Sequence, residues 1–177
     1  MNSLEIKRNV FQTIVYEIET DFETSSTLNF VNTIKFNEDK MYTTYYIIEQ
    51  ILKEEGLKDL KHHIEKFIDI FTKNVLEKNT FKITESWIQA YRKNGHHLLH
   101  VHRLEKNCFS LIFYLQCTEK SSKTVFFSPG YPYTTRESIK ISPKKSKFVI
   151  FPGYVPHEVE LNEDDKRIIF SCNFFVT

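Results

Sequence analysis

Four of the seven histidines of this 177-residue chain lie in one short stretch, Gly95-His-His-Leu-Leu-His-Val-His102. Residues two apart in a β-strand point to the same face, so a strand here would project His100 and His102 together and Val101 to the other side. Two imidazoles on one strand face, joined by a third from a distant strand, would form a transition-metal site that stays open on one side. His157 is the candidate for the third ligand, because it follows the turn sequence Phe-Pro-Gly-Tyr-Val-Pro and enters a new strand.

The remaining histidines are expected to lie outside this site. A histidine taken singly is more often a surface or hydrogen-bonded residue than a metal ligand. His96 and His97 directly follow the Asn-Gly turn and are predicted to be loop residues. His62 and His63 fall on a predicted helix and are expected to be solvated.

Residues 166–176 form an apolar segment in which one set of alternate positions is polar. Arg167, Ser171 and Asn173 share a face with Ile169, whereas the opposite face is wholly apolar. A strand this apolar would be largely buried, so its polar face should line a cavity that satisfies those groups. Arginine is well shaped to hold a carboxylate there through two parallel hydrogen bonds. The alternative is that Arg167 is a surface charge at a strand end.

The elements that must position these residues change character near residue 80. Residues 9–19 alternate as a strand does, and residues 38–54 are predicted to be a helix with Asn37 as its N-cap. Residues 57–78 carry apolar side chains at helical spacing and predict a second helix. The β-rich segments that follow are 81–91, 97–102, 108–117, 124–128, 138–142, 147–151, 156–161 and 166–176.

This pattern predicts a single domain, mainly β with N-terminal helices. Residues 80–177 would form a β-sandwich or jelly-roll core, and residues 1–79 a strand plus two supporting helices that buttress it on one face. The length and the 41% hydrophobic content suit one core of that size.

Composition excludes several classes of partner. The 24 Lys and Arg nearly balance the 23 Asp and Glu, so the chain has no basic footprint for nucleic acid or an anionic membrane. No apolar run is long enough to span a membrane, and the N-terminus lacks a signal-peptide pattern. The three cysteines lie in apolar runs, which indicates reduced thiols and a cytoplasmic location. The oligomeric state is left open.

An ordered set of residues carries a family resemblance. The set is Trp87, Gly95, His100-Val-His102, Ser110, Tyr114-Leu115, Phe151-Pro152, His157, Arg167 and Asn173. Over nearly its whole length the chain resembles the iron(II)- and 2-oxoglutarate-dependent oxygenases, specifically a small phage and marine-bacterial group that is similar to prolyl hydroxylases. Each piece alone is a weak signal, whereas the ordered set is fairly specific.

The resemblance implies a double-stranded β-helix fold, with iron(II) held by His100 and His157. It further implies that 2-oxoglutarate chelates the metal, that its far carboxylate binds Arg167 and Tyr114, and that the protein hydroxylates a C–H bond with release of succinate and CO₂. The residues it marks as candidates for binding the cosubstrate are Arg167, Tyr114, Tyr91 and Asn173.

The chain departs from the wider superfamily at two positions. The superfamily has Asp or Glu where this chain has His102, so either three histidines hold the metal or a carboxylate such as Glu105 does. Strand parity favours His102, and the small group often shows the same His-x-His. Ile169 stands where many relatives have a serine, which removes one hydrogen bond to the cosubstrate.

Two further functions compete with this one. A cupin-type dioxygenase would use a three-histidine iron without 2-oxoglutarate, and a non-catalytic jelly-roll module would hold a structural metal or none. Arg167 favours the 2-oxoglutarate enzyme, and an open three-ligand site argues against a structural role. The primary substrate, a small molecule or a peptidyl side chain, is not specified by the sequence.

Overall fold

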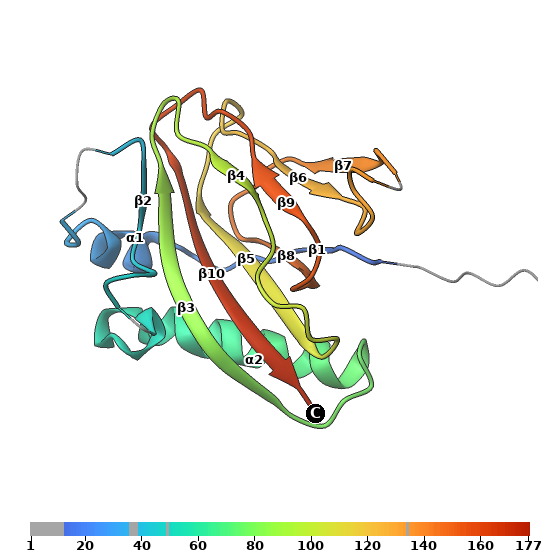
Figure 1. Ribbon diagram of the computed structural model, residues 1–177. Helices are drawn as coiled ribbons and strands as arrows, with labels where there is room; N and C mark the ends of the chain where they lie inside the picture. Colours follow the sequence, from blue (N-terminus) through green and yellow to red (C-terminus); the bar gives the residue numbers. More distant parts are fainter. Residues whose placement is uncertain (1–12, 36–38, 49, 134) are drawn as a thin grey trace, which may run out of the picture.

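The strands that follow residue 80, together with two short strands before it, pair into two antiparallel sheets (Figure 1). The computed structural model describes residues 13–35, 39–48, 50–133 and 135–177. The larger sheet has the strand order β1-β8-β5-β10-β3-β2, and the smaller has the order β4-β9-β6-β7. The strands are β1 Tyr16–Glu19, β2 Met41–Thr43, β3 Phe81–Tyr91, β4 His97–His100, β5 Cys108–Gln116, β6 Thr124–Phe127, β7 Ser138–Ile141, β8 Lys147–Pro152, β9 His157–Val159 and β10 Arg167–Val176.

All eight strands predicted after residue 80 are present, most with ends within two residues of the predicted bounds. Of the strand predicted over 9–19, residues 16–19 form β1, residues 13–15 are not in a strand, and residues 9–12 lie outside the described residues. These strands succeed as predictions because each is a short apolar or alternating run bounded by turn residues. The expected jelly-roll architecture, a double-stranded β-helix, is therefore confirmed.

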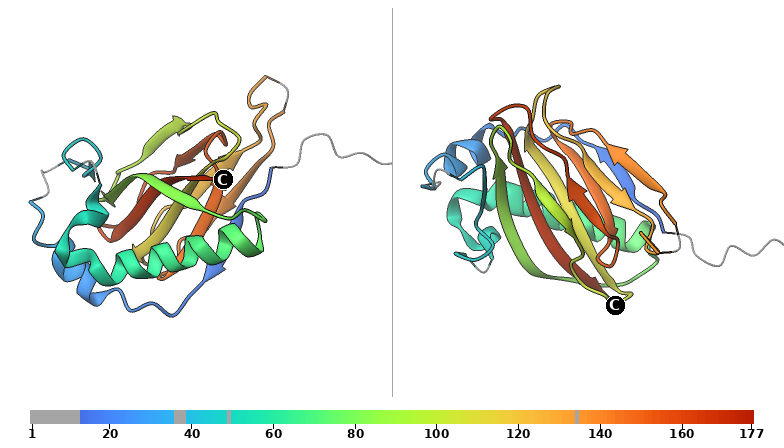
Figure 2. Two further views of the ribbon diagram at one scale, coloured as in Figure 1. Left: turned by 90° about the horizontal axis from the view of Figure 1, so that it is seen from below. Right: turned by 45° about the horizontal axis from the view of Figure 1, so that its top comes forward.

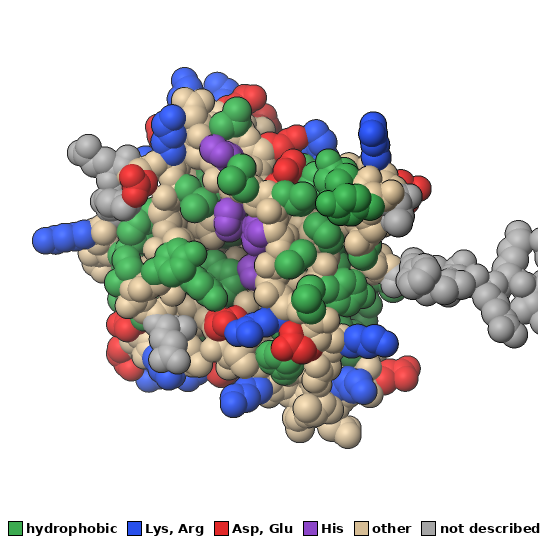
Figure 3. Space-filling model, viewed as in Figure 1, with side chains coloured by type: hydrophobic (Ala, Val, Ile, Leu, Met, Phe, Trp, Pro, Cys, Tyr) green, Lys and Arg blue, Asp and Glu red, His purple; other side chains and the backbone are tan. Residues whose placement is uncertain are grey.

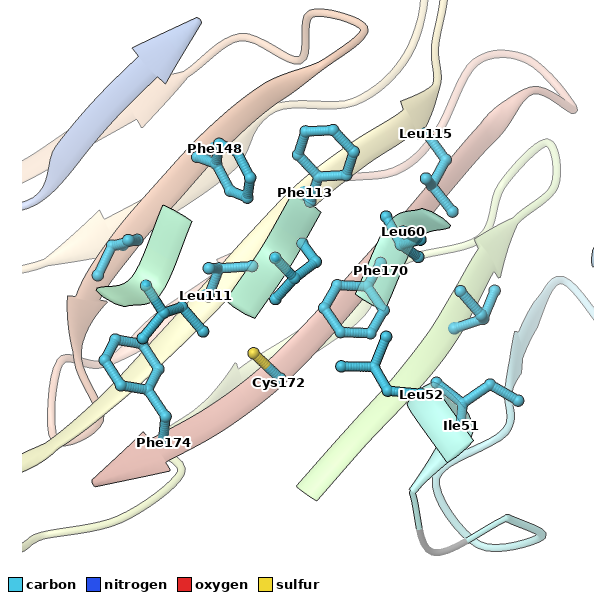
Figure 4. Packing of buried hydrophobic residues seen from close by; sticks show 14 of the residues in the cluster. Ile51, Leu52, Leu60, Leu111, Phe113, Leu115, Phe148, Phe170, Cys172 and Phe174 are labelled. Carbon is cyan, nitrogen blue, oxygen red and sulfur yellow. The ribbon is translucent and has the colours of Figure 1, made fainter. Parts of the chain in front are cut away.

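Helix α2, Lys58–Asn74, covers the face of the large sheet that points away from the small sheet (Figure 2). It confirms the helix predicted over 57–78, although it ends at Asn74. Its apolar stripe is buried as predicted at Leu60, Ile64 and Ile68, which are fully inaccessible to solvent, whereas Val75, just after the helix, is exposed. The stripe packs on the alternate side chains of the sheet that include Phe113, Phe148, Phe170 and Phe174 (Figure 4). This core covers one face of the large sheet, so a site can form only on the other face, which points towards the small sheet.

The helix predicted over residues 38–54 is wrong. Residues 41–43 form β2, which pairs with β3 so that Met41 lies opposite Tyr91, and residues 51–53 and 55–57 form the short 3₁₀ helices η1 Ile51–Lys53 and η2 Glu55–Leu57. The run Met-Tyr-Thr-Thr-Tyr-Tyr is rich in aromatic and β-branched residues, and an available sheet edge favours an extended conformation for it. Asn37, the expected N-cap, lies outside the described residues.

The second supporting helix is α1, Ser25–Val31, a segment with no predicted element. The prediction that His63 is solvated is also wrong. Its ring lies half-buried on α2, stacked on Phe22 at 4.4 Å between ring centroids and close to Phe148. The residues before α1 fold back over this part of α2, which periodicity within the helix itself could not indicate. His62 is exposed, as expected.

A second, smaller core lies between the two sheets. It contains Tyr91, Tyr114 and Ile169 of the large sheet together with Phe126 and Val159 of the small sheet. The expected face division of β10 is thus correct, because Phe170 faces α2 while its neighbour Ile169 faces the small sheet. The same division holds on β5, where Phe113 faces α2 and Tyr114 faces the small sheet. The polar side chains of β10 consequently point into the space between the sheets.

Candidate active site

Three histidines converge at the open end of the space between the sheets. His100 on β4 lies directly opposite His157 on β9 in an antiparallel pair, and His102 follows two residues after His100. The potential ligand atoms of the three residues all lie within 4.8 Å of one another, and the Nε2 atoms of His102 and His157 are 3.3 Å apart. Two cis ligands about 2.1 Å from one metal would be roughly 3.0 Å apart, so this spacing suits a shared ion.

Backbone carbonyls orient two of the three rings. His100 Nδ1 lies 2.7 Å from the Leu98 carbonyl oxygen, and His157 Nδ1 lies 3.0 Å from that of Val155. A carbonyl oxygen can only accept a hydrogen bond, so Nδ1 carries the proton in each ring and Nε2 presents its lone pair. This is the tautomer that a metal ligand needs, held by a hydrogen bond from the outer ring nitrogen.

Burial keeps the three imidazoles uncharged. It lowers the pKa of His102 to about 3 and that of His157 well below the usual value, and His100 adds a smaller repulsion to both. The pKa of His100 is also lowered by burial. Neutral imidazole is the form that binds a transition metal, so folding prepares all three rings for ligation.

Arg167 is fully buried at the opposite end of the space between the sheets. Its Nε donates to the carbonyl oxygen of Ser122 at 3.1 Å, and its Nη2 donates to Thr124 Oγ1 at 2.9 Å. The guanidinium carbon lies 4.4 Å from the ring centroid of Tyr91 and 5.5 Å from that of Tyr114. The alternative that Arg167 is an exposed surface charge is wrong, since the strand end that carries it is covered.

One donor of this buried arginine has no protein partner. Arg167 Nη1 is among the buried side-chain atoms of the described residues without a hydrogen bond. Leaving a buried charged donor unpaired costs on the order of 1–3 kcal/mol or more, so an anionic ligand at this position would recover that cost. The Tyr114 hydroxyl lies 3.1 Å from Thr124 Oγ1, and burial raises the pKa of Tyr91 to about 12, which keeps its hydroxyl protonated.

An outer pocket of about 480 Å³ opens beside the histidines. Its walls come from β2 and the turn after it, from β3, and from β4, and Figure 3 shows histidine side chains exposed in the middle of this face, with hydrophobic side chains on both sides. A narrow inner pocket of about 30 Å³ continues inwards past Trp87 and Gln89 to Tyr91 and Ile169. His100 and His102 line both pockets and His157 lines the inner one, so the candidate metal position lies where the two pockets meet.

Asn173 is not brought together with Arg167. The two lie six residues apart on one face of β10, a separation of roughly 20 Å along a strand. Both ends of the Asn173 amide are already occupied, because Oδ1 accepts from Ser110 Oγ at 2.7 Å and Nδ2 donates to Glu85 at 2.6 Å. Asn173 lines the outer pocket, on the far side of the histidines from the arginine.

Two residues of the site were not foreseen. His97, predicted to be a loop residue, lies on β4, and a register irregularity between it and His100 brings their ring centroids within 3.9 Å. Gln89 is buried, and its Nε2 donates to the Tyr91 hydroxyl at 2.7 Å and approaches His97 Nδ1 at 3.3 Å. Strict alternation places residues 97 and 100 on opposite faces, so no pattern in the sequence pointed to this pair.

No carboxylate joins the three histidines among the described residues that could hold a metal. Glu105, the alternative third ligand, is exposed, and Glu85 is engaged by Arg103 at 2.6 Å as well as by Asn173. The donor set at this end is thus three neutral nitrogens, which suits iron(II) among other transition metals, and the other end offers a buried cation with a spare donor. Both ends fit a metal that carries a dicarboxylate ligand.

The two facing sheets with an open histidine cluster between them define a double-stranded β-helix protein with a potential metal centre. A family model described as "Putative 2OG-Fe(II) oxygenase" matches residues 85–173, which include the three histidines and Arg167. The chain belongs to this family and is thus an oxygenase that uses iron(II) and 2-oxoglutarate.

Solved structures with low sequence identity share the fold. HygX from Streptomyces hygroscopicus, in a structure with nickel, 2-oxoglutarate and hygromycin B bound, is 8% identical with a TM-score of 0.70, covering 93% of this chain and 84% of that one. A Trichoplax adhaerens prolyl hydroxylase in complex with a peptide fragment is 14% identical with a TM-score of 0.64, covering 92% and 82%. The collagen prolyl hydroxylase of Paramecium Bursaria Chlorella virus-1 is 12% identical with a TM-score of 0.63, covering 92% and 96%.

The search of curated proteins found no match. Within the described part of the chain, no helix has the length and apolar content needed to cross a membrane. All three cysteines are free thiols.

Proposed function

We propose that His100, His102 and His157 hold the iron of this oxygenase, and that residues 1–177 act as one catalytic domain. The observation that carries the assignment is the convergence of the three ring nitrogens, two of which lie 3.3 Å apart. Two rings are fixed by hydrogen bonds to backbone carbonyls, and burial keeps all three uncharged. Three protein ligands leave the remaining positions of the metal for the cosubstrate and O₂.

Arg167 is the proposed anchor for the far carboxylate of 2-oxoglutarate. Its unpaired Nη1 supplies a charge-assisted hydrogen bond, and the Tyr91 and Tyr114 side chains flank it. The Ile169 side chain offers no hydrogen bond, and we propose that the Thr124 hydroxyl, which already contacts the guanidinium, completes the anchor. Asn173 is not part of this proposal, because its amide is engaged elsewhere in the outer pocket.

The inner pocket has room for water but not for a five-carbon diacid. Entry of the cosubstrate therefore requires a side chain to move, and Gln89 is the one that bridges Tyr91 and His97. We infer that Gln89 turns aside when 2-oxoglutarate binds, which makes room for the ligand beside the Tyr91 hydroxyl, whose proton Gln89 does not use. The same movement frees His97, whose ring lines both pockets.

When bound, iron(II) and 2-oxoglutarate supply O₂ activation, with decarboxylation to succinate and CO₂ and insertion of one oxygen atom into a substrate C–H bond. The protein orients the cosubstrate between the histidines and Arg167 and excludes bulk water from the inner pocket. The outer pocket, of the size that small-molecule sites have, receives the substrate group beside the metal. The free cysteines support a reducing compartment, the cytoplasm, as the place of action.

The test is succinate release from 2-oxoglutarate with iron(II) and O₂, measured for the wild-type protein, for His157→Ala and for His96→Ala. His96 is exposed and separate from the site, so its variant is a matched control. We expect turnover, including the slow turnover without substrate, to need His157 and to be unaffected by His96→Ala. A wild-type protein that binds iron but gives no detectable 2-oxoglutarate binding by calorimetry would instead support a three-histidine enzyme that does not use this cosubstrate.

A further inference from the structure

The outer pocket lies between two open strand edges. The strand β4 ends the small sheet and β2 ends the large sheet, and residues of both line the pocket. Residues of β4 therefore border the pocket on one side, and residues of β2 and of the turn after it border it on the other. An open edge offers a row of backbone N–H and C=O groups to any extended chain that approaches it.

These two edges differ from the other sheet edges in the charge that they carry. On β1, Glu17 and Glu19 are ion-paired with Lys147 and Lys144, and on β7 Lys140 is paired with Glu160 at 2.5 Å. Charged side chains are the usual protection of an edge against pairing with other chains. Neither β2, Met-Tyr-Thr, nor β4, His-Leu-Leu-His, contains a Lys, Arg, Asp or Glu.

The same two segments expose apolar surface. Seven of the thirteen exposed large hydrophobic residues in the described part of the chain lie on β4 or within five residues after β2 or β4: Tyr45, Tyr46 and Ile47 after β2, and Leu98, Leu99, Val101 and Leu104 on β4 or after it. Leu98 and Leu104 are 73% and 76% exposed, and Tyr46 is 86% exposed. Figure 3 shows hydrophobic side chains on both sides of the histidines, whereas most charged side chains lie nearer the outline of this face. Apolar surface gathered at one site marks an interaction surface.

We propose that the substrate is an extended polypeptide segment that pairs with the edge of β4 and inserts one side chain into the outer pocket. This proposal rests on the proposed function, since the inserted side chain would meet the metal held by the histidines. Strand addition gives affinity through backbone hydrogen bonds, while alternate side chains provide specificity. Side chains two positions on either side of the inserted one point the same way and would contact the exposed apolar residues that follow β2 or lie on and after β4.

A free small molecule would be held within the pocket and would make no use of the exposed leucines beyond its mouth. A second copy of this chain paired at β4 would lie across the pocket mouth, where a substrate must enter. A polypeptide substrate would contact the open edge of β4, the exposed apolar residues beside the pocket and the pocket itself.

The test is selection from a displayed library of random 12-residue peptides, with manganese(II) in place of iron and 2-oxoglutarate present, so that binding is measured without turnover. Selected peptides are then titrated against the wild-type protein, a Leu98→Asp/Leu104→Asp double variant and a Leu161→Asp control. Leu161 is 61% exposed but lies beside a different hollow, near Lys93 and Glu163. All three changes are at exposed positions, and thermal unfolding checks that each variant is folded.

We expect enriched peptides with apolar residues at alternate positions, which bind the wild-type protein and Leu161→Asp equally and the double variant at least 10-fold more weakly. Absence of enrichment, or equal binding to the double variant, would overturn the proposal. Light scattering that finds a dimer converted to a monomer by the double variant would assign this edge to a second copy instead. Separate titrations of metal and 2-oxoglutarate test the proposed function, so its failure is distinguished from failure of peptide binding.

Discussion

His102 and His157 face each other across the site with their Nε2 atoms 3.3 Å apart, although 55 residues separate them in the chain. Their rings lie nearly parallel, at 18°, and their centroids are 5.0 Å apart. The pair matters because His102 stands where the wider superfamily has a carboxylate. A neutral ligand at this position leaves the full double positive charge on iron(II), which attracts the dianionic cosubstrate at least as strongly as a partly neutralised centre would.

Replacing His102 tests whether it is the third ligand. We predict that His102→Ala loses most iron-dependent succinate formation. His102→Asp should keep part of it, because a carboxylate can also bind iron, although the aspartate side chain is shorter than that of histidine and extends less far towards the metal. Iron affinity is measured by calorimetry under anaerobic conditions alongside turnover. If His102→Ala binds iron and turns over like the wild-type protein, His102 is not a ligand and a carboxylate such as Glu105 must be tested next.

Replacing Arg167 tests the cosubstrate anchor. Arg167→Lys retains a positive charge but loses the paired donors, and Arg167→Ala loses both. We expect Arg167→Ala to weaken 2-oxoglutarate binding by about 10- to 150-fold, the equivalent of roughly 1.5–3 kcal/mol for one charge-assisted hydrogen bond. Metal affinity should stay largely intact, because Arg167 lies at the opposite end of the site from the histidines.

Arg167 is fully buried, so thermal unfolding of both variants must be measured with the binding. A variant that stays folded and holds iron but binds 2-oxoglutarate with wild-type affinity would remove Arg167 from the site.

Gly153 is predicted to position His102. The backbone N–H groups of His102 and Arg103 both donate to the Gly153 carbonyl oxygen, at 2.9 and 3.3 Å. A Cβ at residue 153 would lie 3.1 Å from the Arg103 carbonyl oxygen and 3.3 Å from its nitrogen, closer than ordinary contacts. Gly153 is not in the left-handed region, so Gly153→Ala acts through this contact and not through backbone strain.

The expected result of Gly153→Ala is a shift of the 102–103 backbone by a few tenths of an ångström and a several-fold loss of iron affinity, with 2-oxoglutarate binding affected only through the metal. Cobalt(II) substitution reports this directly, since its visible absorption changes with ligand geometry. An unchanged cobalt spectrum and iron affinity would show that the backbone accommodates the extra methyl group elsewhere.

His63 is predicted to make the protein sensitive to acid. Burial against Phe22 and Phe148 lowers its pKa below 6.5, so the folded protein binds this proton less readily than the unfolded chain does. Stability is therefore unaffected by His63 above about pH 6.5 and falls as the pH decreases through the folded pKa.

We expect His63→Gln to lose less thermal stability than the wild-type protein between pH 7.5 and pH 5, with both compared metal-free. His62→Gln, at the adjacent exposed position, is the control and should follow the wild-type curve. Parallel curves for the wild-type protein and His63→Gln would mean that the His63 ring reaches water when it is charged.

Short-range patterns in the sequence were sufficient for most of the β-fold. The strands β3, β5 and β10 are long apolar or alternating segments, and alternation alone assigned Phe170 to one face and Arg167 to the other. The His-x-His spacing likewise pointed to His100 and His102 before any contact was known. The faces of β5 and β10 agree with the alternation because side-chain direction in a strand is fixed by the local backbone. Strand β4 ends at His100, so the position of His102 beside it depends on the turn that follows, and their role as metal ligands stays a prediction.

Only the tertiary structure decided features that depend on which segments meet. Residues 41–43 are extended because the edge of β3 is available to them, and His63 is half-buried because the chain before α1 returns over α2. His97 lies in the site because of a register irregularity in β4. Asn173 lies away from the proposed cosubstrate anchor, because it is roughly 20 Å along β10 from Arg167. Such outcomes depend on strand pairing, register and packing between distant segments, and the periodicity of one segment carries no information about these contacts.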